Sequence, residues 1–143
     1  MRRVVITGLG MVTPLGVSVR GNWEQILKGA SGIRAIERFR VDDLPARIAG
    51  QIPVEDGHPW RFDADTVVTA KDRRRMDDFI LYGLAAAVEA IEDAGWTPSD
   101  EEELERTGVI IGSGIGGLPS ISDSTLVLAN SGPRKISPFF IPS

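Results

Sequence analysis

The chain has 143 residues, 25% of them charged, and a formal net charge of −4. This composition is typical of one globular domain or part of one, and the acidic balance argues against general nucleic-acid binding. The sequence has no cysteine and one histidine, His58, which excludes disulfides, a cysteine nucleophile and multi-histidine zinc sites within it. No apolar run approaches the roughly 20 residues of a membrane span, so we expect a cytoplasmic protein without membrane contact.

The first predicted elements are a strand and a helix. Residues 3–9 (RVVITGL) form a short β-branched run bounded by glycine, which favours a strand buried on both faces. The sequence Gly8-Leu-Gly10 is expected to be a tight turn leaving this strand. A helix over about residues 19–28 follows, because its apolar residues share one face and Gly29 stands where a helix ends.

Residues 30–66 have no sustained periodicity, and three prolines interrupt them. Residues 46–52 are expected to form one short edge strand. A loop region of this length in a compact domain usually has a functional or interface role. His58 lies between Gly57 and Pro59, and we interpret it as an exposed loop histidine rather than a catalytic base.

Residues 70–94 are predicted to form one long helix. Apolar residues recur there at three- and four-residue steps, and Gly95 follows as a C-terminal stop. An acidic turn or short helix is expected at residues 100–103, followed by a second buried strand at residues 107–112 (TGVIIG). Because strand–helix–strand order favours parallel pairing, the predicted fold class is α/β with a parallel sheet.

Gly112, Gly114 and Gly117 follow the second predicted strand and match the pattern G-x-G-x-x-G. One interpretation is a dinucleotide site with the pyrophosphate at a helix N-terminus. Pro119 and the serine-rich run after it disfavour a phosphate-binding helix, and no later strand offers a ribose-binding acid. We prefer an interpretation in which this backbone passes close to another group, so that side chains would not fit.

Two basic clusters stand out on the acidic chain. The sequence KDRRR at residues 71–75 opens the long predicted helix, where cations oppose the helix dipole, and Arg134 and Lys135 lie beside a glycine-proline turn. A charge run of this kind is usually a solvated helix face, and that interpretation stays open. The other interpretation is a docking site for an acidic or phosphorylated partner. The residues alone show no catalytic constellation.

Four segments, taken in their order along the chain, have a pattern found in a known family. They are residues 3–16 (RVVITGLGMVTPLG), 71–79 (KDRRRMDDF), 112–117 (GSGIGG) and 132–143 (GPRKISPFFIPS). Together they resemble the β-ketoacyl-[acyl-carrier-protein] synthases, the condensing enzymes of fatty acid synthesis, and most of all the elongation type II branch. The resemblance covers the whole chain, with residues 40–66 the least similar. It implies part of a thiolase-like fold, a layered αβαβα arrangement.

The resemblance also indicates what residues 1–143 would not contain. Family members are much longer, and their catalytic cysteine, histidines and lysine match positions after residue 143. We therefore expect the N-terminal portion of a synthase, as a fragment or an incomplete sequence, without the cysteine segment and the C-terminal domain. No catalytic residue, metal ligand or cofactor is expected within it. The family reaction is a decarboxylative condensation of an acyl chain with malonyl-carrier protein, through an acyl-cysteine intermediate.

By the same resemblance, particular residues match positions that recognise substrates. Five cations match positions that meet the acidic acyl carrier protein: Lys71, Arg74 and Arg75, with Arg134 and Lys135 as a second patch. Ile115 and Phe140 match positions near the acyl pocket, Phe140 reaching over from the partner subunit of a homodimer. For Phe140, plain core or dimer packing stays open. The implied partners are acyl carrier protein, in its acyl and malonyl forms, and a second copy of the chain.

Two alternatives remain beside a condensing enzyme. The first is a non-catalytic subunit of the same superfamily, such as a chain-length factor, in which another residue stands where the enzymes have cysteine. The second is a dinucleotide-binding protein that uses Gly112–Gly117. A titration with NAD(P)H would separate the second alternative, because a condensing enzyme should not bind that cofactor.

Overall fold

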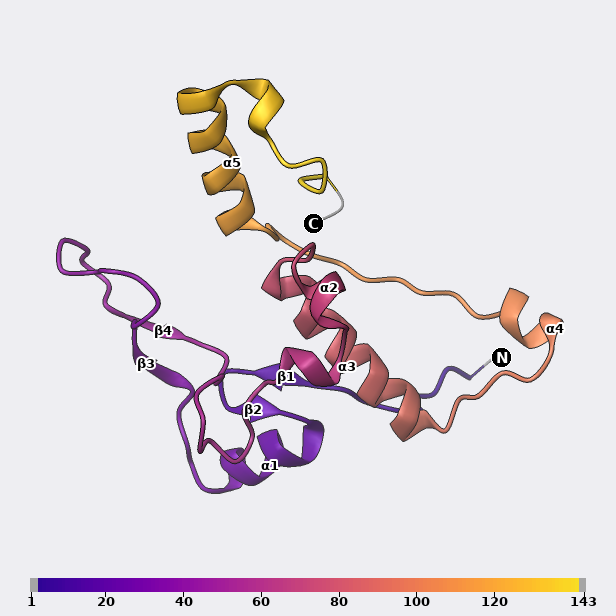
Figure 1. Ribbon diagram of the computed structural model, residues 1–143. Helices are drawn as coiled ribbons and strands as arrows, with labels where there is room; N and C mark the ends of the chain where they lie inside the picture. The colour runs from indigo at the N-terminus through magenta and orange to yellow at the C-terminus, as the bar shows by residue number, and fades with distance from the viewer. Residues whose placement is uncertain (1–2, 142–143) are drawn as a thin grey trace. The chain divides into compact units, whose positions relative to one another are not determined.

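Figure 1 shows the computed structural model of the chain, which describes residues 3–141. The first two residues, and the last two residues of the motif at 132–143, lie outside this range. The chain divides into two compact units, which are considered separately: residues up to Asp63 with Ala85–Thr97, and Ala64–Leu84 with the residues from Pro98 onward. The helices and strands in chain order are β1 (Val12–Thr13), β2 (Gly16–Val17), α1 (Val19–Leu27), β3 (Ile33–Ala35), β4 (Ile48–Gly50), the 3-10 turn η1 (Ala64–Thr66), α2 (Ala70–Arg73), α3 (Asp78–Ala94), α4 (Glu101–Glu105), α5 (Leu118–Ser131) and the 3-10 turn η2 (Pro133–Lys135).

In the first unit, the β1–β2 hairpin leads directly into α1. Asn22 of α1 is buried, and its amide nitrogen donates to the carbonyl oxygens of Gly16 (2.9 Å) and Ser18 (2.7 Å). The Thr13 hydroxyl donates to the amide oxygen of the same side chain. These bonds satisfy a buried polar group and join the hairpin to the helix. The prediction of a helix at 19–28 is confirmed, and Gly29 follows it with φ +67°.

The Gly8-Leu-Gly10 sequence is not the tight turn that we predicted. Its backbone crosses the surface of α3 so closely that a Cβ atom on Gly8 would lie 2.2 Å from the Ala90 oxygen. A Cβ atom on Gly10 would lie 1.7 Å from the Ala86 oxygen. Both distances are far below van der Waals contact, so glycine is required here by the close approach of two backbones.

Two carboxylates of α3 hold the same crossing in place. The Leu9 amide donates to Asp93 Oδ2 at 2.9 Å, and the Met11 amide donates to Glu89 Oε2 at 2.9 Å. The other oxygen of Glu89 accepts from the Val19 amide, the first of α1, at 2.8 Å. One side chain of α3 therefore fixes both the crossing segment and the start of α1, whose first amides have no partner within the helix.

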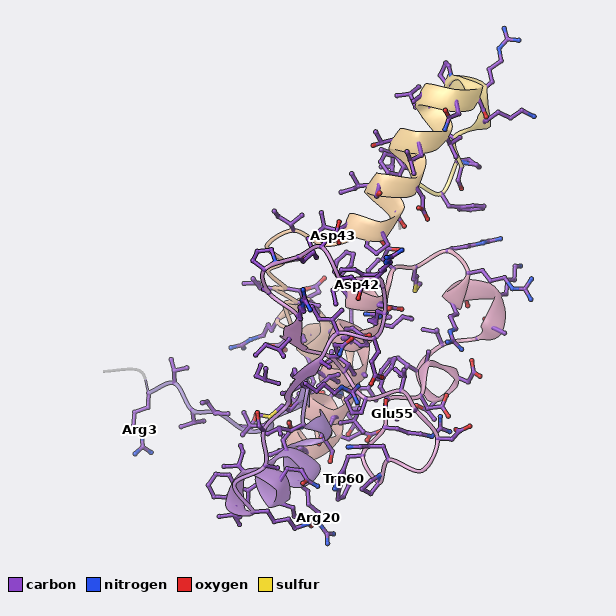
Figure 2. All side chains as sticks on the ribbon, turned by 90° about the vertical axis from the view of Figure 1, so that its left-hand side faces the viewer. Arg3, Arg20, Asp42, Asp43, Glu55 and Trp60 are labelled. Atoms are coloured by element: carbon purple, nitrogen blue, oxygen red, sulfur yellow. The ribbon has the colours of Figure 1, made fainter. Side chains whose placement is uncertain are left out.

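The irregular region contains an antiparallel pair. Strand β3 pairs with β4 in the register Ile33–Gly50 and Ala35–Ile48, so the edge strand predicted at residues 46–52 is confirmed in a shorter form. Trp60 lies against α1 (Figure 2). Its ring is so close to Gly21 that a Cβ atom there would lie 2.5 Å from the nearest ring carbon. This tryptophan therefore packs locally against α1.

The strands predicted at residues 3–9 and 107–112 do not form. In the part of the chain that the structure describes, the only sheets are two antiparallel pairs, and no parallel sheet is present. The side chains of the two runs are exposed, with 97% of Val4 and 99% of Ile110 open to solvent. Their composition favours an extended backbone, but a strand also needs a neighbour to accept and donate its backbone hydrogen bonds, and the described residues provide none.

The single helix predicted at residues 70–94 is wrong, because the chain breaks it into α2 and α3. Helix α2 ends at Arg73, and Asp77 precedes the first residue of α3 and accepts the Ile80 amide through its backbone oxygen at 3.0 Å. Residues 70–77 contain no glycine or proline, so the sequence did not mark this break. The basic residues consequently lie at the C-terminal end of a short helix, where the dipole favours cations. The dipole argument for a docking site therefore does not hold.

Two further helices complete the second unit. Helix α4 confirms the acidic helix expected near residues 100–103. The serine-rich stretch, for which we predicted no element of its own, forms α5, with Pro119 in its first turn. Proline is tolerated there because the first amides of a helix have no partner within it. Among the described residues, every helix is too short or too polar to cross a bilayer.

Candidate functional site

A hollow of about 180 Å³ lies in the second unit, between the start of α3, helix α5 and the segment that follows η2. Its walls mix cations, hydroxyls, carboxylates and aromatic rings. The lining residues are Arg74, Arg75, Met76, Asp77, Ser120, Asp123, Ser124, Ser137, Phe139 and Phe140. Three of the residues singled out from the sequence are therefore brought together here, namely Arg74, Arg75 and Phe140.

The aromatic side of the hollow is connected to its cationic side. The guanidinium of Arg75 lies over the ring of Phe139, and the backbone amides of Phe139 and Phe140 both donate to Ser137, at 3.2 Å to its hydroxyl and 3.1 Å to its carbonyl oxygen. Ser137 thus forms a turn that presents two consecutive aromatic residues. A cation facing an aromatic ring is attracted by the ring quadrupole. Arg74 is exposed to solvent beside this contact.

The other predicted site residues do not line this hollow. Lys71 is exposed on α2, and Arg134 and Lys135 are exposed on η2, after the end of α5. Ile115 lies in the loop before α5 with 77% of its surface exposed. The structure therefore separates the second basic patch, and the aliphatic residue assigned to the acyl pocket, from the Arg74–Phe140 hollow.

Asp77 and Ser120 are residues of this site that the sequence did not point to. The Ser120 hydroxyl donates to Asp77 Oδ1 at 2.6 Å, across 43 positions of the chain. The second carboxylate oxygen, Oδ2, is buried and has no hydrogen-bond partner among the described residues. No signal in the sequence singles out either residue, because the two lie far apart in the chain and are common polar types.

Close contact with other groups, our preferred explanation for the glycine motif, holds at Gly116 and Gly117. A Cβ atom on Gly116 would lie 2.5 Å from the Phe79 ring, and one on Gly117 would lie 2.7 Å from Asp77 Oδ2. Gly117 also has φ +68°, in the left-handed region that favours glycine. At Gly112 and Gly114 a Cβ atom would meet no described neighbour within 4 Å, so close contact does not account for glycine there.

His58 is half-buried rather than exposed as expected. Its Nδ1 accepts the Trp60 backbone amide at 3.2 Å, so the ring stabilises a local turn. No group of three or more metal-ligating side chains occurs within residues 3–141.

Comparison with known proteins connects this geometry to a family. The sequence profile described as "Beta-ketoacyl synthase, N-terminal domain" matches residues 1–143. The 3-oxoacyl-[acyl-carrier-protein] synthase 2 of Rhizobium meliloti (strain 1021) is 51% identical over 142 residues, which are 99% of this chain and 34% of that protein. The protein of the same name from Vibrio cholerae is 46% identical over 142 residues, covering 99% of this chain and 32% of that protein. The chain thus spans about a third of the length of these relatives.

A solved structure supports the same relationship. The structure described as "The ishigamide ketosynthase/chain length factor" superposes with a TM-score of 0.73 at 26% sequence identity, covering 98% of this chain and 33% of that one. The predicted fold class, an α/β chain that forms part of a thiolase-like fold, is therefore confirmed, although the buried parallel strands expected within it do not form among residues 3–141.

Proposed function

The chain belongs to the β-ketoacyl synthase family, whose N-terminal domain it matches throughout, and from this premise we propose that it forms the substrate-recognising part of a 3-oxoacyl-[acyl-carrier-protein] synthase. Residues 1–143 then correspond to the N-terminal portion of that enzyme. The nucleophile comes from sequence outside this chain, because the chain contains no cysteine. The protein would act in the cytoplasm, as a homodimer, on acyl carrier protein in its acyl and malonyl forms.

The proposed reaction is a decarboxylative condensation. A cysteine thiolate takes the acyl group from its carrier thioester and releases the carrier thiol. Malonyl-carrier protein then loses carbon dioxide, and the resulting carbanion attacks the acyl-cysteine carbonyl, which forms the carbon–carbon bond and returns the thiolate. The negative charge that develops on the thioester oxygen is stabilised by hydrogen-bond donors. We assign these donors, like the nucleophile, to sequence outside this chain. Its own contribution is to bind the carrier and to accommodate the acyl chain.

The observation that carries the proposal is the shared hollow of Arg74, Arg75 and Phe140. A carrier protein with an acidic surface would meet the two arginines, together with Lys71 on the preceding helix. Exposed charge pairs contribute about 0.2–1 kcal/mol each, so several must act together. We assign Arg134 and Lys135 as a second patch for the same partner. Contacts of this kind raise the association rate and weaken as salt increases.

For the acyl chain we propose Ile115 and Phe140. The aliphatic side chain of Ile115 is exposed, with 77% of its surface open to solvent. Phe140 is half-buried at the edge of the hollow and would reach the acyl pocket of the partner subunit in a homodimer. Apolar surface of this kind suits an aliphatic ligand, because its burial removes that surface from water.

A chimera tests the proposal directly. Residues 1–143 would replace the matched first part of the Rhizobium meliloti synthase, and condensation of acyl- with malonyl-carrier protein would be measured. We expect the chimera to condense and the isolated 143-residue chain not to. A chimera that folds yet fails to condense, beside an active parent enzyme, would contradict the proposal. Condensation by the isolated chain would contradict the assignment of the nucleophile.

A non-catalytic chain-length factor is the second candidate, because the similar solved structure is named for a chain length factor as well as a ketosynthase. The two candidates differ at one position in the sequence that follows this chain. Cysteine at the nucleophile position indicates an enzyme, and any other residue indicates a partner subunit. Sequencing the gene beyond codon 143 distinguishes them.

A further inference from the structure

We propose that Asp77 is a positioning residue for the acyl pocket, because its carboxylate holds the Gly116–Gly117 turn that carries Ile115. The inference rests on the proposed function for the role of Ile115, while the contacts that carry it are independent of that role. All of the residues involved belong to the second unit.

The carboxylate of Asp77 is held at the start of α5. Its Oδ1 accepts the Ser120 hydroxyl at 2.6 Å, and its Oδ2 lies 2.7 Å from the place where a Cβ atom on Gly117 would be. Helix α5 has no acidic residue in its first turn, and Gly117 has no side chain with which to cap it. A negative charge near a helix N-terminus is favourable, so Asp77 supplies from another element the acidic charge that α5 lacks, although its Oδ2 accepts no hydrogen bond from the described residues.

Phe79 holds the preceding residue of the same turn. Its ring occupies the space beside Gly116, where a Cβ atom would lie 2.5 Å from ring carbons. Two side chains from the start of α3 therefore contact two consecutive glycines. Because no side chain intervenes, Asp77 and Phe79 pack directly against this backbone, and Ile115 is the next residue along it.

The same carboxylate is adjacent to the residues proposed to meet the carrier protein. Asp77 follows Arg74, Arg75 and Met76 in the chain, and all four line one hollow. Asp77 therefore joins the basic segment to the loop of Ile115, although Ile115 does not line the hollow that contains the two arginines. A change at Asp77 should therefore alter how acyl chains of different length are accepted.

Paired substitutions in the chimera separate this role from a general structural effect. Ser120→Ala removes the hydroxyl that holds Asp77, whereas Ser124→Ala removes the same group one turn later from the wall of the same hollow. Asp77→Asn and Asp123→Asn form a second matched pair, with an equal change of charge. Ser120→Thr keeps the hydroxyl and should restore the behaviour of the unsubstituted chimera.

We expect Ser120→Ala and Asp77→Asn to change the ratio of kcat/KM for long and short acyl chains by roughly three- to tenfold, less than the full cost of a lost hydrogen bond to a charged group because the effect on the acyl chain is indirect. Equal acyl profiles for the Ser120 and Ser124 variants in an active chimera would overturn the inference and leave the proposed function standing.

Backbone amide hydrogen exchange gives a readout that does not depend on activity. Loss of the Asp77 contact should accelerate exchange at Gly116–Ile121 in Ser120→Ala relative to Ser124→Ala. Unchanged exchange in that segment overturns the inference even if the chimera is inactive. An inactive chimera with the expected exchange difference instead supports the positional role and rejects the proposed function.

Discussion

The guanidinium carbon of Arg75 lies 4.4 Å from the centre of the Phe139 ring. Such contacts contribute about 0.5–1 kcal/mol at exposed sites. We expect Phe139→Leu to lower the free energy of unfolding more when Arg75 is present than when it is replaced, and the difference should equal this contact energy. A double-mutant cycle with Arg75→Ala, measured by urea unfolding, isolates the pairwise energy. Strictly additive effects would show that the contact contributes nothing to stability.

Reversal of charge at Arg74 and Arg75 should weaken carrier recognition. With both residues changed to glutamate in the chimera, the KM for acyl carrier protein should rise roughly tenfold at low salt, since attraction is replaced by repulsion. The effect should shrink as ionic strength increases. Arg40→Glu is the control, because Arg40 is an exposed cation outside the proposed docking residues. An unchanged KM in the double variant would count against the assignment.

Replacing Ile115 with phenylalanine should shorten the acyl chain that the chimera accepts. The larger side chain would take up space that a long acyl chain needs, so long chains would lose kcat/KM by about tenfold and short chains would not. Product lengths measured by mass spectrometry report this change. Leu118→Phe, at an exposed aliphatic residue just inside α5, serves as the comparison. An unaltered length profile for the Ile115 variant would remove it from the acyl pocket.

Glu55 should titrate far below an ordinary carboxyl. The hydrogen bond from Arg34, followed by backbone hydrogen bonds, lowers its pKa from 4.5 to about 2. Because the folded pKa is depressed, the stabilising contribution is complete above pH 4.5 and is lost as the pH falls from 4.5 towards 2. Carbon-13 NMR of the carboxyl should show this low midpoint, and Arg34→Ala should raise it. A midpoint near 4.5 in the unsubstituted chain would contradict the contact.

Two glycine-to-alanine substitutions should have opposite effects on stability. A Cβ atom on Gly10 would lie 1.7 Å from the Ala86 oxygen, so Gly10→Ala should lower the free energy of unfolding by at least about 2 kcal/mol. Gly83 lies within α3 with nothing within 4 Å of its Cβ position, so Gly83→Ala should raise it by about 1 kcal/mol. Urea unfolding measures both changes. Equal stability of the two variants would show that the backbone at Gly10 can move away from α3 at little cost, which would contradict the prediction.

The helices were predictable where the signals that define them are local. The apolar face and Gly29 were sufficient for α1, and an acidic run after Ser99 was sufficient for α4. The break before α3 was missed because residues 70–77 contain no glycine or proline to mark the end of α2 at Arg73. The buried strands at 3–9 and 107–112 were wrong because strand formation depends on a partner elsewhere, which composition does not report.

The candidate site was predictable only in part, for a related reason. Arg74 and Arg75 were conspicuous by charge, and the family motif pointed to Phe140, but their meeting in one hollow depends on the return of the chain after α5. The Asp77–Ser120 contact joins residues 43 positions apart and involves common polar types. Only the folded arrangement distinguishes them from solvated surface residues.

The crossing of Gly8 and Gly10 over α3 has a consequence for how this unit tolerates evolutionary change. Each glycine faces an alanine position on the helix, and the amide of Leu9 between them is bound to Asp93. Sliding the segment by one residue would force the leucine side chain into the helix backbone. Insertions or deletions should therefore accumulate in the loops on either side. The alignment of Gly8 and Gly10 with the alanine positions of α3 should persist in distant relatives.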